Sequence, residues 1–126
     1  IDLAPTILDL AGVQTPKTMQ GRSLRPLLEG QVPDDWRTAF FYEYFEENPF
    51  PTPTVFALRT ETAKLVRYPG HEDWTQLYDL RTDPHEMNNL ADDPAQAELR
   101  KQLAAEFDRQ AEAVGLPLPL PERAPK

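Results

Sequence analysis

The chain has 126 residues, a formal net charge of −8 and no cysteine. This length fits one small domain, or one domain plus part of another. The negative charge argues against binding to a nucleic acid, and the absence of cysteine excludes disulfides, thiolate metal sites and cysteine nucleophiles. The apolar runs are far too short for a membrane span, and the cellular compartment stays undetermined.

Two short helices are predicted at the start of the chain. Apolar residues recur at helical spacing between Asp2 and Gly12, which predicts a helix with one buried face that ends at the glycine. The apolar positions of this face are Leu3, Ile7, Leu10 and Ala11. A second helix is predicted from Ser23 to Glu29, with Ser23 as its N-cap. Because the chain begins at Ile1 inside the first helical pattern, we expect that helix to belong to a larger domain upstream.

The middle of the chain is rich in β-favouring residues separated by Pro, Gly, Asn or Asp, which predicts short strands. Their predicted ranges are Thr38–Phe45, Thr54–Thr60, Ala63–Tyr68 and Thr75–Leu80. Only Glu61 and Thr62 separate the second strand from the third, which is too short for a parallel crossover, so the sheet should be an antiparallel meander. A carboxylate on a half-buried strand needs a partner, and we expect Glu43 to pair with Arg59 or Lys64.

A longer helix is predicted after the strands, with Asp93 as its cap and Gly115 at its end. Its stripe consists of Leu99, Leu103, Phe107, Gln110 or Ala111, and Val114. The alternating Leu-Pro sequence that follows favours an extended tail, which either packs back or binds a neighbour. The predicted fold class is α+β, with a small four-stranded antiparallel sheet packed by the C-terminal helix.

The loop between the third and fourth predicted strands holds the best candidates for ligand contact. His71, Glu72 and Asp73 join a titratable ring to two carboxylates, and Trp74 follows them. A solvated hairpin loop is the alternative interpretation. Because the two histidines, His71 and His85, stand alone with acids nearby only in predicted loops, and Ser23 lacks a glycine elbow, we expect neither a metal site nor a catalytic residue in this chain.

Two motifs in the chain resemble the C-terminal region of bacterial sulfatases. The sequence LYDLRTDPHEMNNLA, from Leu77 to Ala91, resembles a segment near the C-terminus of many of these enzymes. The stretch from Ile1 to Gly12, followed by the stretch from Met19 to Leu24, is similar to the part that closes their large catalytic domain. The predicted hairpin from Leu58 to Val66 is a weaker match, and the proline-rich tail matches nothing in the family.

The resemblance implies a parent enzyme of the alkaline-phosphatase-like superfamily that hydrolyses sulfate esters of small molecules or glycans. Such an enzyme uses a calcium ion and a formylglycine made in a C/S-x-P-x-R motif, which this sequence lacks. The chain alone should therefore be inactive and hold no cofactor. The resemblance also divides the chain into the end of the upstream α/β catalytic domain at 1–30, a sulfatase C-terminal subdomain at 31–115 and a Pro-rich tail at 116–126.

The upstream catalytic domain is the partner that this division implies, and His71, Glu72, Asp73 and Trp74 are then candidates for the rim of the substrate pocket. Two alternatives stay open. A phosphodiesterase or phosphonate monoester hydrolase shares the fold and differs in its upstream nucleophile motif. A stand-alone protein-interaction module would instead use the sheet and the tail to contact another chain, and the oligomeric state is left open.

Overall fold

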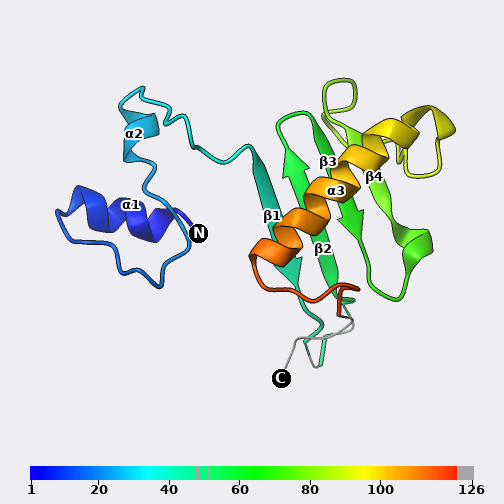
Figure 1. Ribbon diagram of the computed structural model, residues 1–126, viewed down its shortest axis with the longest axis horizontal. Helices are drawn as coiled ribbons and strands as arrows, with labels where there is room; N and C mark the ends of the chain where they lie inside the picture. Colours follow the sequence, from blue (N-terminus) through cyan, green and yellow to red (C-terminus); the bar gives the residue numbers. More distant parts are fainter. Residues whose placement is uncertain (48, 51, 122–126) are drawn as a thin grey trace. The chain divides into compact units, whose positions relative to one another are not determined.

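The computed structural model describes residues 1–47, 49–50 and 52–121. The chain forms two compact units, Ile1–Arg37 and Thr38–Lys126, which we call the N-terminal unit and the sheet unit. Figure 1 shows the helices of the first and the sheet of the second. Of the helices in the described residues, none combines the length and the hydrophobicity that a membrane crossing requires.

The N-terminal unit contains two short helices, α1 (Leu3–Leu10) and α2 (Arg25–Leu28). Gly12 follows α1 with a φ of 71°, the left-handed conformation that glycine adopts without a steric penalty, and this confirms the predicted stop. Leu24 takes the cap position of α2, one residue after the predicted Ser23. The Ser23 hydroxyl still accepts a hydrogen bond of 3.2 Å from the backbone N–H of Arg25, as an N-cap does, and it donates one of 2.6 Å to the Asp9 carboxylate.

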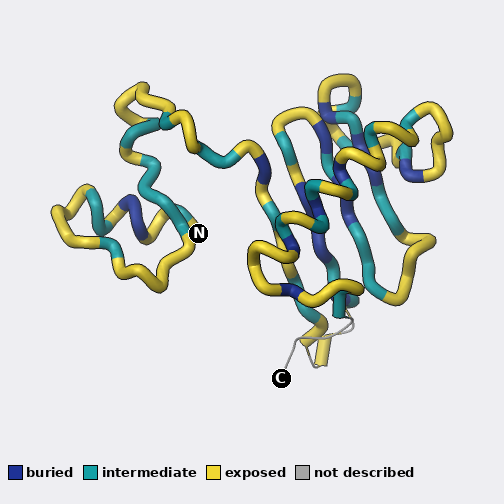
Figure 2. Tube along the Cα trace, in the orientation of Figure 1, coloured by how far each residue is buried: buried dark blue, intermediate teal, exposed yellow. Residues whose placement is uncertain are grey.

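The predicted buried face of α1 is exposed in this structure. Leu3, Ile7 and Leu10 have exposed fractions of 73%, 65% and 61%, whereas Pro5 and Thr6 are the buried residues of this helix (Figure 2). The reason is that the helix meets the rest of its unit through polar contacts on its other side. The helical period predicted from the sequence is therefore confirmed. The burial of this face stays a prediction, because the helix is expected to belong to a domain upstream of this chain.

Polar groups of α1 and its N-cap hold the segment that precedes α2. The Asp2 carboxylate accepts a hydrogen bond of 2.9 Å from the backbone N–H of Arg22 and also pairs with the Arg37 guanidinium. The Thr6 hydroxyl accepts a hydrogen bond of 2.8 Å from the backbone N–H of Leu24. The bonds to Arg22 and Leu24 satisfy backbone N–H groups that the irregular segment could not satisfy within itself. The Ile1–Gly12 stretch thus binds the Met19–Leu24 stretch, which completes the same sulfatase-like motif.

Gly21 packs closely against the backbone of Ile1. A Cβ atom on Gly21 would lie 2.1 Å from the carbonyl oxygen of Ile1. We expect Gly21→Ala to destabilise the N-terminal unit by about 1–2 kcal/mol, because overpacking forces the backbone to shift. Hydrogen exchange of the Arg22 and Leu24 amides, measured by NMR, should become faster. Gln20→Ala, at an exposed neighbouring position, is the control, and unchanged exchange in Gly21→Ala would contradict the prediction.

The sheet unit contains a meander of antiparallel strands in the order β1-β2-β3-β4 within the described residues. The strands are β1 (Ala39–Tyr44), β2 (Val55–Thr60), β3 (Ala63–Arg67) and β4 (Gln76–Asp79). Each begins and ends within two residues of its predicted range. One register row joins Phe41, Leu58, Leu65 and Leu77, and these side chains build the core beneath the helix. The α+β prediction is confirmed.

The C-terminal helix α3 (Ala97–Ala113) lies across one face of the sheet (Figure 1). Its buried residues Leu103, Phe107 and Ala111 belong to the predicted stripe, whereas Val114 at the end of the stripe is exposed. Asp93 accepts a hydrogen bond of 2.9 Å from Ala95 and thereby caps a short 3-10 turn (Pro94–Gln96) that leads into α3. The predicted cap is correct in residue but belongs to this turn.

The described part of the proline-rich tail packs back on the sheet unit. Leu116 is buried in the hydrophobic core, and Leu120 is partly buried against it. The backbone N–H of Leu116 donates to the carbonyl of Ala111 at 2.9 Å, and Gly115 between them has a φ of 79°. Residues 122–126 of the predicted tail lie outside the described residues.

Candidate functional site

The predicted site residues form a 3-10 turn (Glu72–Trp74) between β3 and β4. The His71 ring stacks on Trp74, with centroids 4.0 Å apart and planes 7° from parallel, and Tyr68 meets Trp74 edge-on at 5.8 Å. The backbone N–H of Trp74 donates to the His71 carbonyl at 3.0 Å, which closes the turn. This packing fixes the Trp74 ring, although 46% of the residue is exposed.

The turn separates two hollows of about 550 Å³ each. Asp73 and Trp74 line one of them, and Glu72 lines the other. The first hollow is completed by Thr52, Pro53, Val55, Tyr68, Gln76 and Asn89. Its neighbour lies between Tyr68 and the tail residue Leu118. The four predicted residues therefore do not converge on a single hollow, and His71, which stacks on Trp74, lines neither of the two.

The sequence analysis missed Tyr68 and Gln76, which help to line the hollow beside Trp74. The predicted strands already contained these two residues. In the observed register Val66 pairs with Gln76, so Tyr68 and Gln76 lie on either side of the turn that carries Trp74. Strand alternation places residues of the same parity on the same face. Tyr68 and Gln76 could thus have been assigned to the face that includes Val66.

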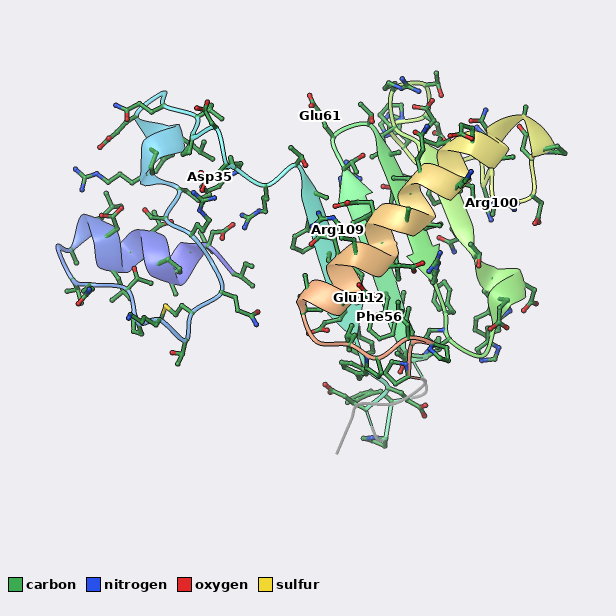
Figure 3. The ribbon with its side chains drawn as sticks, viewed as in Figure 1. Asp35, Phe56, Glu61, Arg100, Arg109 and Glu112 are labelled. Atoms are coloured by element: carbon green, nitrogen blue, oxygen red, sulfur yellow. The ribbon has the colours of Figure 1, made fainter. Side chains whose placement is uncertain are left out.

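The motif after β4 is anchored by its asparagine. The Asn89 side-chain oxygen accepts hydrogen bonds from the backbone N–H groups of Leu77 at 2.9 Å and Ala91 at 3.0 Å. Its amide nitrogen donates to the Thr75 carbonyl at 3.0 Å. Arg100, which Figure 3 labels on α3, donates a hydrogen bond of 2.7 Å to the Ala91 carbonyl. Asn89 therefore anchors the end of the motif to β4.

Two aspartates hold the loop between β4 and Asn89. The pKa of Asp79 is lowered, because Arg81 donates hydrogen bonds to its carboxylate, the shortest at 2.8 Å. The pKa of Asp83 is lowered because backbone N–H groups, first that of Asn88 at 2.8 Å, donate to its carboxylate. Hydrogen bonding to the charged form explains both directions. These carboxylates act as structural acceptors.

Glu86 neutralises the cations on the sheet. Its two carboxylate oxygens bind Arg59 at 3.0 Å and Lys64 at 2.6 Å. The predicted pairing of Arg59 or Lys64 with Glu43 is therefore wrong. Glu43 lies on the edge strand β1 opposite Phe56 and is exposed, so water can solvate its carboxylate without a protein partner. The loop of the Leu77–Ala91 motif, which we call the motif loop, thus supplies the carboxylate that was expected from β1.

The residues of this chain do not fit the metal and cofactor that the resemblance implies. Across residues 1–47, 49–50 and 52–121, no group of three or more His, Asp or Glu side chains could hold a metal ion. The sequence contains no cysteine, and its only serine, Ser23, is bound to Asp9. The described residues therefore offer no ligand group for a calcium ion, and Ser23 does not stand in a C/S-x-P-x-R motif.

Comparison with known proteins identifies the family. A family profile described as N-sulphoglucosamine sulphohydrolase, C-terminal, matches residues 1–113. The N-acetylglucosamine-6-O-sulfatase of Bacteroides thetaiotaomicron is 40% identical over 109 residues, which cover 82% of this chain and 19% of that protein. The multifunctional alkaline phosphatase superfamily protein PehA of Trinickia caryophylli is 36% identical over 116 residues, which cover 82% of this chain and 22% of that protein.

Solved structures agree with this assignment. BT4656 in complex with its substrate D-glucosamine-2-N,6-O-disulfate matches with a TM-score of 0.76 and 36% identity, over 88% of this chain and 23% of that one. The phosphonate monoester hydrolase SpPMH from Silicibacter pomeroyi matches with a TM-score of 0.72 and 33% identity, over 89% of this chain and 24% of that one. The chain thus spans about a fifth to a quarter of these proteins.

The sheet with its C-terminal helix and the anchored motif loop define the chain as the C-terminal region of a sulfatase-type protein of the alkaline-phosphatase-like superfamily. It belongs to the family of N-sulphoglucosamine sulphohydrolase C-terminal domains. The resemblance stated from the two sequence motifs is therefore confirmed.

Proposed function

We propose that the full-length protein containing this chain is a sulfatase that hydrolyses sulfate esters of sugars. The observation that carries the proposal is the 40% identity to an N-acetylglucosamine-6-O-sulfatase, within a family match that spans residues 1–113. The calcium ion and the formylglycine belong, in this proposal, to the part of the protein outside this chain. The chain contributes a scaffold and one rim of the substrate pocket, and alone it is inactive.

The rim is assigned to the turn that carries Trp74. The half-exposed indole borders a hollow that also contains the Tyr68 ring, the Asp73 carboxylate and the Gln76 amide. Sugar rings present apolar faces to aromatic side chains and hydroxyl groups to carboxylates and amides. Among the described residues that line this hollow there is no Lys or Arg, so we assign it to the uncharged part of the substrate.

Replacing Trp74 with alanine in the full-length protein should raise KM on a sulfated sugar about fivefold and leave kcat unchanged. Loss of an aromatic contact of about 1 kcal/mol that exists in both the ground and transition states gives this pattern. Steady-state kinetics measure it, and His71→Ala should show a smaller change in the same direction because it frees the indole to move. The matched control is His85→Ala in the motif loop, and equal kinetics for Trp74→Ala and wild type would remove the rim assignment.

The proposal is tested on the full-length protein with two substrate classes. Release of sulfate from N-acetylglucosamine 6-sulfate is compared with hydrolysis of a phosphonate monoester, and the coding sequence upstream of Ile1 is searched for a C/S-x-P-x-R motif. We expect the motif and a preference for the sulfate ester. A preference for the phosphonate would favour the alternative, which the 33% identity to a phosphonate monoester hydrolase supports.

A further inference from the structure

The hollow beside Trp74 carries a single charge among the described residues that line it, the carboxylate of Asp73. The rest of this lining is neutral and includes the rings of Trp74 and Tyr68 and the amide of Gln76. Asp73 is exposed, and within the described part of the chain no hydrogen bond or ion pair holds its carboxylate. Its negative charge therefore acts on any group that enters the hollow.

The arginines on either side of the turn are bound to other acids. Arg67, at the end of β3, pairs with Asp108 at 2.7 Å and lines the neighbouring hollow. Arg81, after β4, pairs with Asp79 at 2.8 Å. Neither arginine lines the hollow beside Trp74. An anionic group that enters this hollow would therefore meet the Asp73 carboxylate without a compensating cation from its lining.

The polar groups of the hollow suit neutral hydrogen-bonding groups of a sugar. A carboxylate such as that of Asp73 only accepts hydrogen bonds, so it binds a hydroxyl or an acetamido N–H. The Gln76 side-chain oxygen accepts from the Tyr78 hydroxyl at 3.2 Å, so the amide N–H groups are what Gln76 offers to a ligand. A sulfate has no hydrogen to donate to Asp73 and is repelled by its charge. Repulsion of this kind separates two ligands as effectively as attraction does.

We propose that Asp73 makes the full-length protein selective for sugars with a single sulfate, because it excludes a second sulfate from the hollow beside Trp74. This inference rests on the proposed function and gives Asp73 a role distinct from that of Trp74. Two like charges about 6 Å apart repel enough to weaken binding roughly tenfold, between the limits for bulk water and for a protein surface. Asp73 is exposed, so salt should reduce this selectivity.

Steady-state kinetics of the full-length protein test the selectivity. N-acetylglucosamine 6-sulfate is compared with three analogues that carry a second sulfate at position 2, 3 or 4, and loss of the 6-sulfate is followed by NMR. We expect kcat/KM for at least one analogue to be about tenfold lower than for the monosulfated sugar. Asp73→Asn removes the charge and keeps the size, so it should reduce this ratio to about twofold. Glu72→Gln is the matched control, because Glu72 lies in the same turn and lines the other hollow.

Two results would overturn the role of Asp73. One is a ratio that stays within about twofold of wild type in Asp73→Asn for all three analogues. The other is an equal change in Asp73→Asn and Glu72→Gln, which would assign the selectivity to the overall charge of the turn. In either case, hydrolysis of the monosulfated sugar leaves the proposed function standing. A full-length protein that cleaves none of the four sugars would instead contradict the proposed function, and the selectivity with it.

Discussion

Replacing Asn89 with leucine is expected to destabilise the sheet unit by about 2–4 kcal/mol, because two buried backbone donors lose their acceptor at once. The Asn89 side chain accepts from the N–H groups of Leu77 and Ala91, and both residues are buried. Leucine has a similar volume and no acceptor, so the change removes the hydrogen bonds without opening a cavity. Urea denaturation of the 126-residue chain, followed by circular dichroism, should show a lower midpoint with an unchanged slope.

The adjacent asparagine provides a matched control for this prediction. Asn88 is bound through its backbone N–H, which donates to the Asp83 carboxylate at 2.8 Å, so a change of its side chain leaves that bond in place. Asn88→Leu should therefore change the free energy of unfolding by less than about 0.5 kcal/mol. Equal losses in the two variants would mean that the loop tolerates no leucine, and the specific role assigned to Asn89 would then be wrong.

The architecture of the sheet unit could be predicted because its signals are local. Alternation and turn residues defined each strand, and the two-residue connection at Glu61 and Thr62 made one hairpin antiparallel. The helical stripe likewise identified Leu103 and Phe107 as core residues. Burial and pairing were predicted less well, because they depend on what lies across from a residue. The pairing of Glu86 with Arg59 and Lys64, in place of Glu43, is an example.

The candidate site was predicted less completely than the fold, because its shape also depends on residues that are distant in the sequence. The turn from His71 to Trp74 was identified from residue types alone, but its division between two hollows depends on the curvature of the hairpin and on the packed tail. Tyr68 became visible as a neighbour only when β3 and β4 were placed in register. The rim assignment therefore remains a prediction, which the Trp74 variant tests.

Phe107 is the residue of α3 on which the two layers of the sheet unit depend most. Its side chain is fully buried and meets Phe41 of β1 edge-on, with ring centroids 5.1 Å apart. On another side the Arg67 guanidinium lies 4.4 Å from its ring centroid and also binds Asp108 at 2.7 Å. The Phe107 ring thus contacts β1 through Phe41 and β3 through Arg67. Because the interior is close-packed, these neighbours cannot refill its space if the ring is removed.

Phe107→Ala is accordingly expected to cost about 3–5 kcal/mol, the sum of lost apolar burial and the cavity that remains. Small domains have about 5–15 kcal/mol of stability in total, so this loss is a large part of it and should lower the melting temperature by at least about 12 °C. Thermal unfolding of the 126-residue chain measures this, with Val114→Ala at an exposed position of the same stripe as the control. A loss of less than about 1 kcal/mol would show that α3 is not held by this core. A large loss in Phe107→Ala with none in Val114→Ala would instead place the stability of the sheet unit in the contact between α3 and the sheet.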